Sequence, residues 1–391
     1  MYLTWKIILR EIKRIEERKT LYLLMIVLPL IVFALYSLIY KQEIVRELPV
    51  AIYDADHSPL CQKIVELVES SSSMKIIKYD QSIDEVKKDF FDGKIQGAFY
   101  FPRNMEKDLK EGKNSSVVVF KNTSNLIIGN MILKDATAII RTVSAGVVLK
   151  KFRSKGMTYE RALALINPIK IETNPLYNSN YSYLNYMVPG VIGFTFQMLI
   201  MIASVIVISS EFSHNTFGNL LELAERKVWR IILGKFVPHF LIHFATALMI
   251  IGITFPLSNI TIHGSIILLM LLFAAFIAAN LMIGLAISSF FHDQMFATEL
   301  AVFINTPAFI ISGFTFPIWA MPAALKAFSQ LMPFTHFLSG FLKIYQMNTD
   351  PKYVINDFSS LLIFIFASLI PLWFTLRYHA KIHKSLIGGD K

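Results

Sequence analysis

The sequence predicts a polytopic α-helical membrane protein with six transmembrane helices and an extracytoplasmic α/β domain inserted between helices one and two. Of its 391 residues, 54% are hydrophobic, which is high for a soluble domain. Six apolar runs are candidate membrane crossings, because a helix of roughly 20 apolar residues spans the hydrocarbon core. One long segment lacks such runs and alternates strand-like with helix-like stretches.

Residues 1–19 alternate apolar with basic side chains at helical spacing. The apolar set is Trp5, Ile8, Leu9, Ile12 and Ile15. We therefore predict an amphipathic interfacial helix on the inner membrane surface, followed by transmembrane helix 1 over residues 20–40. A signal peptide is the alternative. The apolar run is too long for its h-region, and no Ala-x-Ala cleavage site follows.

Residues 41–184 are the predicted extracytoplasmic α/β domain, because strands that alternate with helices favour a sheet covered by helices. Strands are expected at 49–53, 75–79, 96–101 and 117–120, and helices at 59–69, 84–91, 105–111 and 127–155. Asp54–Ser58 resembles a metal or phosphate loop. No glycine-rich cradle follows it and Ser58-Pro59 is a helix start, so we interpret it as a polar turn.

Residues 185–391 contain transmembrane helices 2–6. These are expected at about 185–209, 236–257, 265–290, 299–311 and 358–376. A polar loop, 210–235, separates the second and third helices. The stretch 312–345 has three prolines and is too interrupted for one span, so it is predicted to be an outer re-entrant stretch. Residues 377–391 form the predicted tail.

The distribution of Lys and Arg sets the predicted orientation. The segments 1–19, 210–235 and 377–391 hold fourteen basic residues, against three in the short connections 258–263 and 312–357. Both termini are therefore expected in the cytoplasm. The same bias accounts for the net charge of +10 without a nucleic-acid partner.

Catalytic and nucleotide-binding motifs are absent from the sequence, which has no GxxxxGK[ST], HExxH, CxxC or GxSxG. One cysteine, Cys61, cannot form an intrachain disulfide. His239 and His243 share a helix face and could bind a metal or relay protons, but such residues are more often polar groups packed between helices. No carboxylate lies deep in a span, as ion-driven carriers usually require. We expect no catalytic, cofactor or metal residues, and an energy source outside the chain.

Three stretches resemble the membrane subunits of type-2 ABC exporters, in the subgroup with a large outer domain between spans one and two. The first, in the domain, is LPVAIYDADHSPL…DGKIQGAFYFPRNMEKDLKEGKNSSVVVFKNTSN. The second is Glu211-x4-Thr216…Leu220-Leu221…Leu233-Gly234-Lys235. The third and most specific is SGFTFP…MP…PFTHF, within 312–337. The resemblance covers essentially the whole chain.

This resemblance implies a permease that exports a hydrophobic or amphipathic substrate, such as a drug, lipid or peptide, while a separate ATPase subunit uses ATP and Mg. That ATPase would dock on the loop after span two. The coupling residues carried over by position are Glu211, Thr216, Leu220, Leu221, Gly234 and Lys235. A second permease copy, identical or related, completes the unit in the lipid bilayer, and a periplasmic adaptor is a further candidate partner.

The sequence departs from the family pattern at His214-Asn215, where a second acidic residue and a glycine are usual, and at Ala224-Glu225, where a proline is common. These departures leave the identity of the ATPase open. On physical grounds alone the loop is either a stiff element that transmits a push to the spans or an ordinary solvated connection.

The aromatic-rich outer stretch is a predicted exit gate. Its residues are Phe314, Phe316, Pro317 and Trp319. The alternative function is a membrane sensor whose outer α/β domain binds a ligand, and the short tail without an effector domain counts against it. An intramembrane enzyme would need a paired acid, base or nucleophile set, which the spans lack. The sequence leaves the substrate and the choice between homodimer and heterodimer open.

Overall fold

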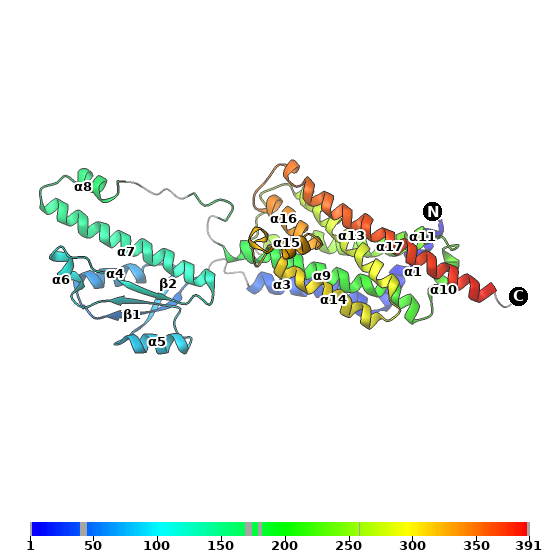
Figure 1. Cartoon of the computed structure of the whole chain (residues 1–391), viewed down its shortest axis with the longest axis horizontal. Coiled ribbons are helices and arrows are strands. Elements are labelled where there is room, and N and C mark those ends of the chain that lie inside the picture. The colour runs from blue at the N-terminus through cyan, green and yellow to red at the C-terminus, as the bar shows by residue number, and fades with distance from the viewer. Residues whose placement is uncertain (1, 40–44, 169–173, 179–181, 258, 389–391) are drawn as a thin grey trace. The chain divides into compact units, whose positions relative to one another are not determined.

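The computed structural model describes residues 2–39, 45–168, 174–178, 182–257 and 259–388 (Figure 1). The chain divides into two compact units, one of Met1–Glu43 with Pro175–Lys391 and one of Ile44–Asn174. The first unit is helical and the second is α/β. The sequence predictions that fall on Met1, on residues 40–44, 169–173 and 179–181, on Ser258 and on residues 389–391 lie outside the described residues.

The α/β unit is built on a four-stranded sheet with the order β2-β1-β3-β4. The strands are β1 (Leu48–Asp54), β2 (Met74–Tyr79), β3 (Gly97–Phe101) and β4 (Val118–Lys121). β1 pairs in parallel with both β2 and β3, and β4 is antiparallel to β3. The helices are α4 (Pro59–Glu69), α5 (Ile83–Phe91), α6 (Met105–Lys110), α7 (Leu126–Ser154) and α8 (Tyr159–Ile166). All bounds except those of α8, which the sequence did not predict, lie within one residue of expectation.

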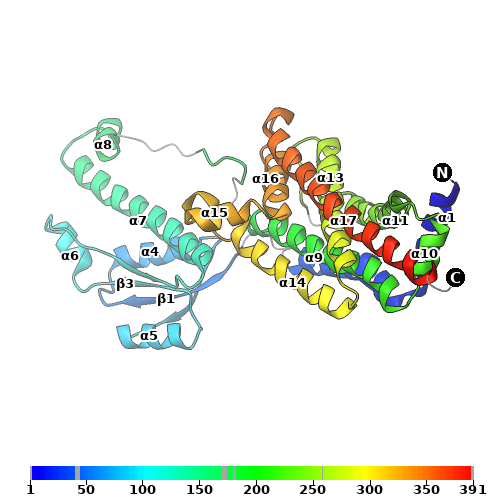
Figure 2. The same ribbon diagram turned by 45° about the vertical axis from the view of Figure 1, so that its right-hand side comes forward.

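Parallel pairing requires crossover helices, and α4 and α5 supply them on opposite faces of the sheet (Figure 2). Alternate side chains of β1 point to opposite faces of the sheet. Val50 and Ile52 contribute to the core that α4 and α7 cover, and Ala51 packs with Val86 of α5. Asp54–Ser58 is a polar turn: Asp54 accepts hydrogen bonds from the amides of Asp56 and His57, each 2.9 Å long. The Ser58 hydroxyl then caps α4 by accepting from the Cys61 amide.

Six helices among the described residues are long and apolar enough to cross a membrane. They are Lys19–Tyr36, Leu184–Ser213, Val228–Leu257, Ile266–Phe290, Gln294–Ile311 and Ile355–His383. Their elements are α2 (Lys19–Tyr22), the π-helix η1 (Leu23–Val27) and α3 (Leu28–Ile39); α9 (Tyr183–Ser213); α11 (Val228–Met249), the π-helix η2 (Ile250–Thr254) and α12 (Phe255–Leu257); α13 (Ile266–Phe290); α14 (Gln294–Ile311); and α17 (Ile355–Gly388). The amphipathic helix α1 (Tyr2–Glu17) precedes them.

The core of the helical unit forms around α13, which packs against α9 and α17. Close approach of α9 and α13 depends on small residues, because a Cβ added at Gly284 would overlap the side chain of Ser204. Nearer the start of α13, Phe276 stacks on Phe337 of α16 (Pro333–Tyr345) with ring centroids 4.0 Å apart. The sequence predicted 312–345 as an outer excursion. The structure forms it as η3 (Ile318–Ala320), α15 (Ala323–Ser329) and the largely buried α16, and η4 (Pro351–Tyr353) then leads into α17.

Three predicted boundaries were wrong, each because polar residues continue a helix. The loop 210–235 is mostly helical: α9 extends to Ser213, α10 covers Phe217–Leu223 and α11 begins at Val228. The fifth span begins at Gln294, where the Asp293 side chain caps the amide of Met295. Residues 377–388 of the predicted tail continue α17, since no glycine or proline interrupts the helix between Pro371 and its last residue, Gly388.

Helix α1 also buries a face that the sequence pattern did not single out. Its buried residues are Ile7, Glu11 and Ile15, whereas Trp5 and Leu9 of the predicted apolar face are 57% and 49% exposed. The helix therefore has two faces, one packed against the protein and a second, apolar one left uncovered. Both α1 and the end of α17 lie at the same end of the helical unit as α10 (Figure 1).

Candidate functional site

A cluster of buried charges joins three helices at this end of the helical unit. Glu211, at the end of α9, lies at its centre and has no exposed surface. The guanidinium of Arg10 donates to its two carboxylate oxygens at 2.8 and 2.9 Å, and Lys235 of α11 donates at 2.5 Å. Arg14 also pairs with this carboxylate. The arrangement ties α1 and α11 to the last turn of α9.

A second carboxylate, Glu11 of α1, completes the cluster. It accepts a hydrogen bond from Lys235, so this ammonium bridges Glu11 and Glu211. His239, one helical turn after Lys235, contacts the other Glu11 oxygen at 3.1 Å. Glu11 is 2% exposed and Lys235 is fully buried. Burying such charges is costly unless each is paired and hydrogen-bonded, and here each of the two carboxylates has several cationic neighbours.

The electrostatics of α1 follow from this burial. Burial opposes ionisation of Glu11, but Lys235, His239 and Arg14 outweigh it and hold the pKa of that carboxyl well below its usual range. Burial lowers the pKa of Arg14 to about 10, which leaves the guanidinium charged at neutral pH. Within the cluster, Glu11 is therefore an ionised carboxylate beside a charged Arg14 guanidinium.

The turn after Glu211 is fixed by the same carboxylate. The Thr216 hydroxyl donates a hydrogen bond to the Glu211 carboxylate, and the Ser210 hydroxyl accepts a 3.1 Å hydrogen bond from Arg14. Between them, Asn215 has φ +54°, in the left-handed region that asparagine tolerates better than most residues. The family pattern has a glycine at this position, and glycine adopts a positive φ easily. Asn215 adopts a positive φ here as well, so the turn forms without the glycine.

Helix α10 presents one apolar and one polar face. Phe217, Leu220 and Leu221 are buried in a core shared with Ile7 of α1 and Ile231 of α11. Asn219 and Glu222 face outward and are exposed. The apolar side of this short helix is therefore held by the membrane-spanning helices, and its polar side is free to meet a soluble partner.

Close packing of α1 on α11 depends on Gly234. A Cβ at this position would overlap the Cγ2 atom of Ile7 and lie 2.7 Å from its Cβ. Any larger side chain would separate the two helices at the level of Lys235. The glycine at 234 and the lysine at 235 therefore serve the same contact, one by allowing approach and one by pairing with Glu11.

The structure brings all six sequence-predicted coupling residues into one region. Glu211 and Lys235 belong to the charge cluster, Thr216 contacts Glu211, Leu220 and Leu221 hold α10, and Gly234 faces Ile7. Sequence reasoning missed Arg10, Glu11 and Arg14, and it named His239 without connecting it to this cluster. One signal was present: Glu11 lies midway between Ile7 and Ile15 at four-residue spacing, so it belongs to the face that they bury.

The other predicted positions are more dispersed. His243 packs edge-on against Phe196, and neither of its ring nitrogens has a hydrogen-bond partner within the described residues. The described ranges contain no group of metal-ligating side chains. Of the predicted gate, Phe314 stacks on Tyr186 with centroids 5.8 Å apart and packs on Gly190. Phe316, Pro317 and Trp319 are exposed and do not join that contact.

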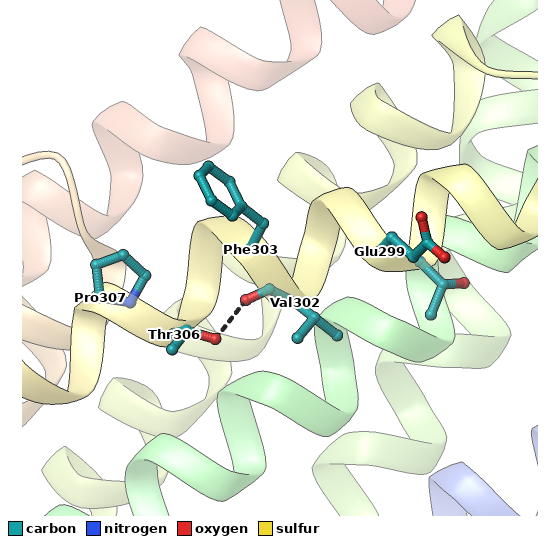
Figure 3. Close-up of a pocket in the computed structure, with 6 residues that line it drawn as sticks. Glu299, Val302, Phe303, Thr306 and Pro307 are labelled. Carbon is teal, nitrogen blue, oxygen red and sulfur yellow. Dashed lines mark hydrogen bonds between the residues drawn. The ribbon is translucent and has the colours of Figure 1, made fainter.

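A shallow hollow on α14 is a second candidate site (Figure 3). It is lined by Thr298, Glu299, Val302, Phe303, Thr306 and Pro307. The Thr306 hydroxyl, its central polar group, donates to the Val302 carbonyl at 2.8 Å. Phe303 is 76% exposed on this face. The hollow is thus the apolar surface of a spanning helix, and we assign it no chemistry.

The model of the ABC-2 family of transporter proteins matches residues 19–374. This chain belongs to that family. It is an ABC-2 permease subunit, a multi-pass membrane protein without a nucleotide-binding site of its own. Membership implies an ABC ATPase as its partner, and it confirms the resemblance found in the sequence.

Named relatives of this ABC-2 permease agree with the assignment. It is 20% identical over 287 residues to the probable multidrug ABC transporter permease YbhS of Escherichia coli K12, which covers 71% of this chain and 70% of the relative. It is 26% identical over 187 residues to the probable multidrug ABC transporter permease YbhR of the same strain, covering 48% of this chain and 50% of the relative. The same relatives of strain O157:H7 match equally.

Proposed function

We propose that this ABC-2 permease exports a hydrophobic or amphipathic substrate from the bacterial cytoplasm, driven by ATP and Mg on a separate ATPase that docks on α10. The observation that carries the proposal is the charge cluster around Glu211. It joins α1, α9 and α11, and it reaches the start of α10 through Thr216, the residue that precedes this helix.

Docking on α10 is supported by the distribution of its side chains. The apolar face is already covered by the protein's own helices, so an arriving ATPase would meet Asn219 and Glu222. The turn that follows adds Glu225, Arg226 and Lys227, all exposed. A polar, mixed-charge surface of this kind suits a soluble partner that binds and releases.

Transmission from α10 to the far side is supported by the continuity of α9. This helix is continuous from Tyr183 to Ser213, with Pro189 near its first end, so a tilt imposed at Glu211 would be carried along it to Gly190 and, across the proline, to Tyr186. Both of those residues contact Phe314. Stiff helices that move as bodies are a common means of switching. We propose Phe314 as the gate residue, and Phe316, Pro317 and Trp319 as its exposed surroundings.

The orientation in the membrane is part of the proposal. The excess of Lys and Arg near α1, α10 and the end of α17 supports a cytoplasmic location for that end, in the inner membrane. The exposed Trp5, Leu9 and Ile12 of α1 suit the membrane interface beside it. The α/β unit would then lie outside the cytoplasm, where it is available to an adaptor protein. A second permease copy would complete the transport pathway.

Reversal of an exposed charge on α10 tests the docking surface. The variant Glu222→Arg should fail to retain the cognate ATPase during purification and should no longer stimulate its ATP hydrolysis. Glu160→Arg, an equal change on the exposed surface of α8, is the matched control and should behave as the unaltered protein. Normal retention and stimulation with Glu222→Arg would contradict docking on α10.

A further inference from the structure

The α/β unit contains a groove between α4, α6 and α7, outside the region that the transport mechanism uses. Its volume is about 710 Å³, within the range of roughly 300–1,000 Å³ typical of small-molecule sites. The floor is apolar, with Leu60 and Leu67 from α4, Leu109 from α6, and Val143 and Val147 from α7. An apolar floor of this extent in an aqueous domain favours an apolar occupant.

The rim of the groove is basic. Lys63, Lys110, Lys150 and Lys151 line it, with Glu106 as the one carboxylate. Glu106 pairs with Lys110 at 2.8 Å, which neutralises that lysine. Lys63, Lys150 and Lys151 make no ion pair within the described part of the chain and are exposed. Three uncompensated positive charges therefore surround an apolar floor.

Gly146 keeps the groove open in the middle of α7. A Cβ at this position would meet nothing within 4 Å, so no close packing requires glycine here. Its backbone is helical, so no unusual dihedral angle requires it either. Glycine is the least favourable residue in a helix interior apart from proline. Gly146 lines the groove, so a side chain at this position would occupy part of it. We therefore attribute the glycine to the groove.

We propose that this groove binds an anionic amphiphile, with one acyl or alkyl chain on the Leu–Val floor and its carboxylate or phosphate head group among Lys63, Lys150 and Lys151. Charge complementarity selects the head group, and apolar burial holds the chain. The site does not depend on the proposed coupling through α10, because it lies within the α/β unit and its binding is measured without an ATPase.

Photo-crosslinking tests the site in the full chain. The protein is placed in phosphatidylcholine nanodiscs, and the probe is a 12-carbon carboxylate with a diazirine at the chain end. We expect mass spectrometry to locate the adducts on α4 and on the 142–154 part of α7. Gly146→Trp, which fills the groove, should lower this labelling about tenfold, the effect of losing about 1.4 kcal/mol of binding free energy. Ser144→Trp, at an exposed position of α7 outside the groove, should label normally.

The head group is tested by charge reversal and by competition. Lys63→Glu with Lys150→Glu should weaken labelling, whereas Arg141→Glu, exposed elsewhere on α7, should not. Competition by dodecanoate, by dodecyl phosphate or by both supports the site and identifies the head group. Equal competition by dodecyltrimethylammonium would overturn the anionic assignment. Absence of adducts on α4 and α7, or adducts unaffected by Gly146→Trp, would overturn the groove as a binding site. Protection of buried Cys61 from alkylation shows that each variant is folded.

Discussion

The carboxylate of Glu211 accepts two parallel hydrogen bonds from the guanidinium of Arg10, at 2.8 and 2.9 Å, across 201 residues of sequence. This paired geometry fixes the angle between α1 and the end of α9, because the planar fork of arginine matches a carboxylate in one orientation. The amphipathic N-terminal helix is thus part of the element behind α10. It is more than a membrane anchor.

The energetics of the cluster predict that removing one charge is worse than removing a pair. Glu11→Leu leaves Lys235, Arg10 and Arg14 with Glu211 alone, and loss of one partner in a buried pair costs about 3–5 kcal/mol. Glu11→Leu combined with Lys235→Met removes both charges and should recover part of that loss. Thermal unfolding of the purified variants measures this, and a double variant less stable than Glu11→Leu alone would contradict the pairing.

Acid should weaken the attachment of α1. The pKa of Glu11 in the folded protein lies below its ordinary value of 4.5, so the stabilisation is fully present above that pH. Below it, the unfolded chain takes up a proton that the folded chain does not, and the free energy of unfolding falls. The melting temperature should therefore decline from about pH 5 downward, and less steeply in Glu11→Gln. Equal slopes for the two proteins would count against an ionised, paired Glu11.

Two glycines in spanning helices should differ sharply in their tolerance of valine. Gly284→Val forces a side chain into Ser204 at the crossing of α9 and α13, so it should reduce the yield of folded protein and its melting temperature. Gly252→Val is the matched control, since nothing lies within 4 Å of a Cβ there. Size-exclusion profiles and thermal unfolding measure both. Similar behaviour of the two variants would show that α9 and α13 do not approach so closely.

The single cysteine reports on the α/β unit. Cys61 lies on the buried face of α4, and burial raises the pKa of its thiol from 9.0 to about 12. At pH 8 the folded protein should therefore contain roughly a thousandfold less thiolate than a free thiol, and should react slowly with iodoacetamide. Denaturant should restore fast alkylation. Fast alkylation of the native protein would mean that α4 is not packed on the sheet as described.

Much of the fold followed from local patterns. The four strands were predicted because β-branched runs such as that of β1 alternate with capped helices, and Ser58-Pro59 marks the start of α4. The six apolar helices followed from hydropathy. The ends of α9, α14 and α17 were harder, because charged residues that leave the membrane can continue a helix without a break in the backbone.

The candidate site was only half visible in the sequence. Glu211 and Lys235, 24 residues apart, were both named in advance because the family resemblance carried them over by position. Arg10 and Glu11 belong to a segment more than two hundred residues earlier, which no local pattern connects to α11. The basic, amphipathic pattern of this segment predicted only a helix at the membrane surface. The contact that fixes it is a long-range ion pair, and sequence periodicity does not reveal such pairs.

In the proposed mechanism, force applied at α10 reaches the outer end of α9 through Glu211. This central claim is tested most directly by a cysteine at Phe314 in a Cys61→Ser background, reconstituted with the cognate ATPase in proteoliposomes. The rate of labelling by a membrane-impermeant maleimide is measured with and without ATP. The account predicts that ATP changes this rate when Glu211 is present. It also predicts no change in Glu211→Gln, although the ATPase remains bound. An undiminished ATP-dependent change in Glu211→Gln would contradict it.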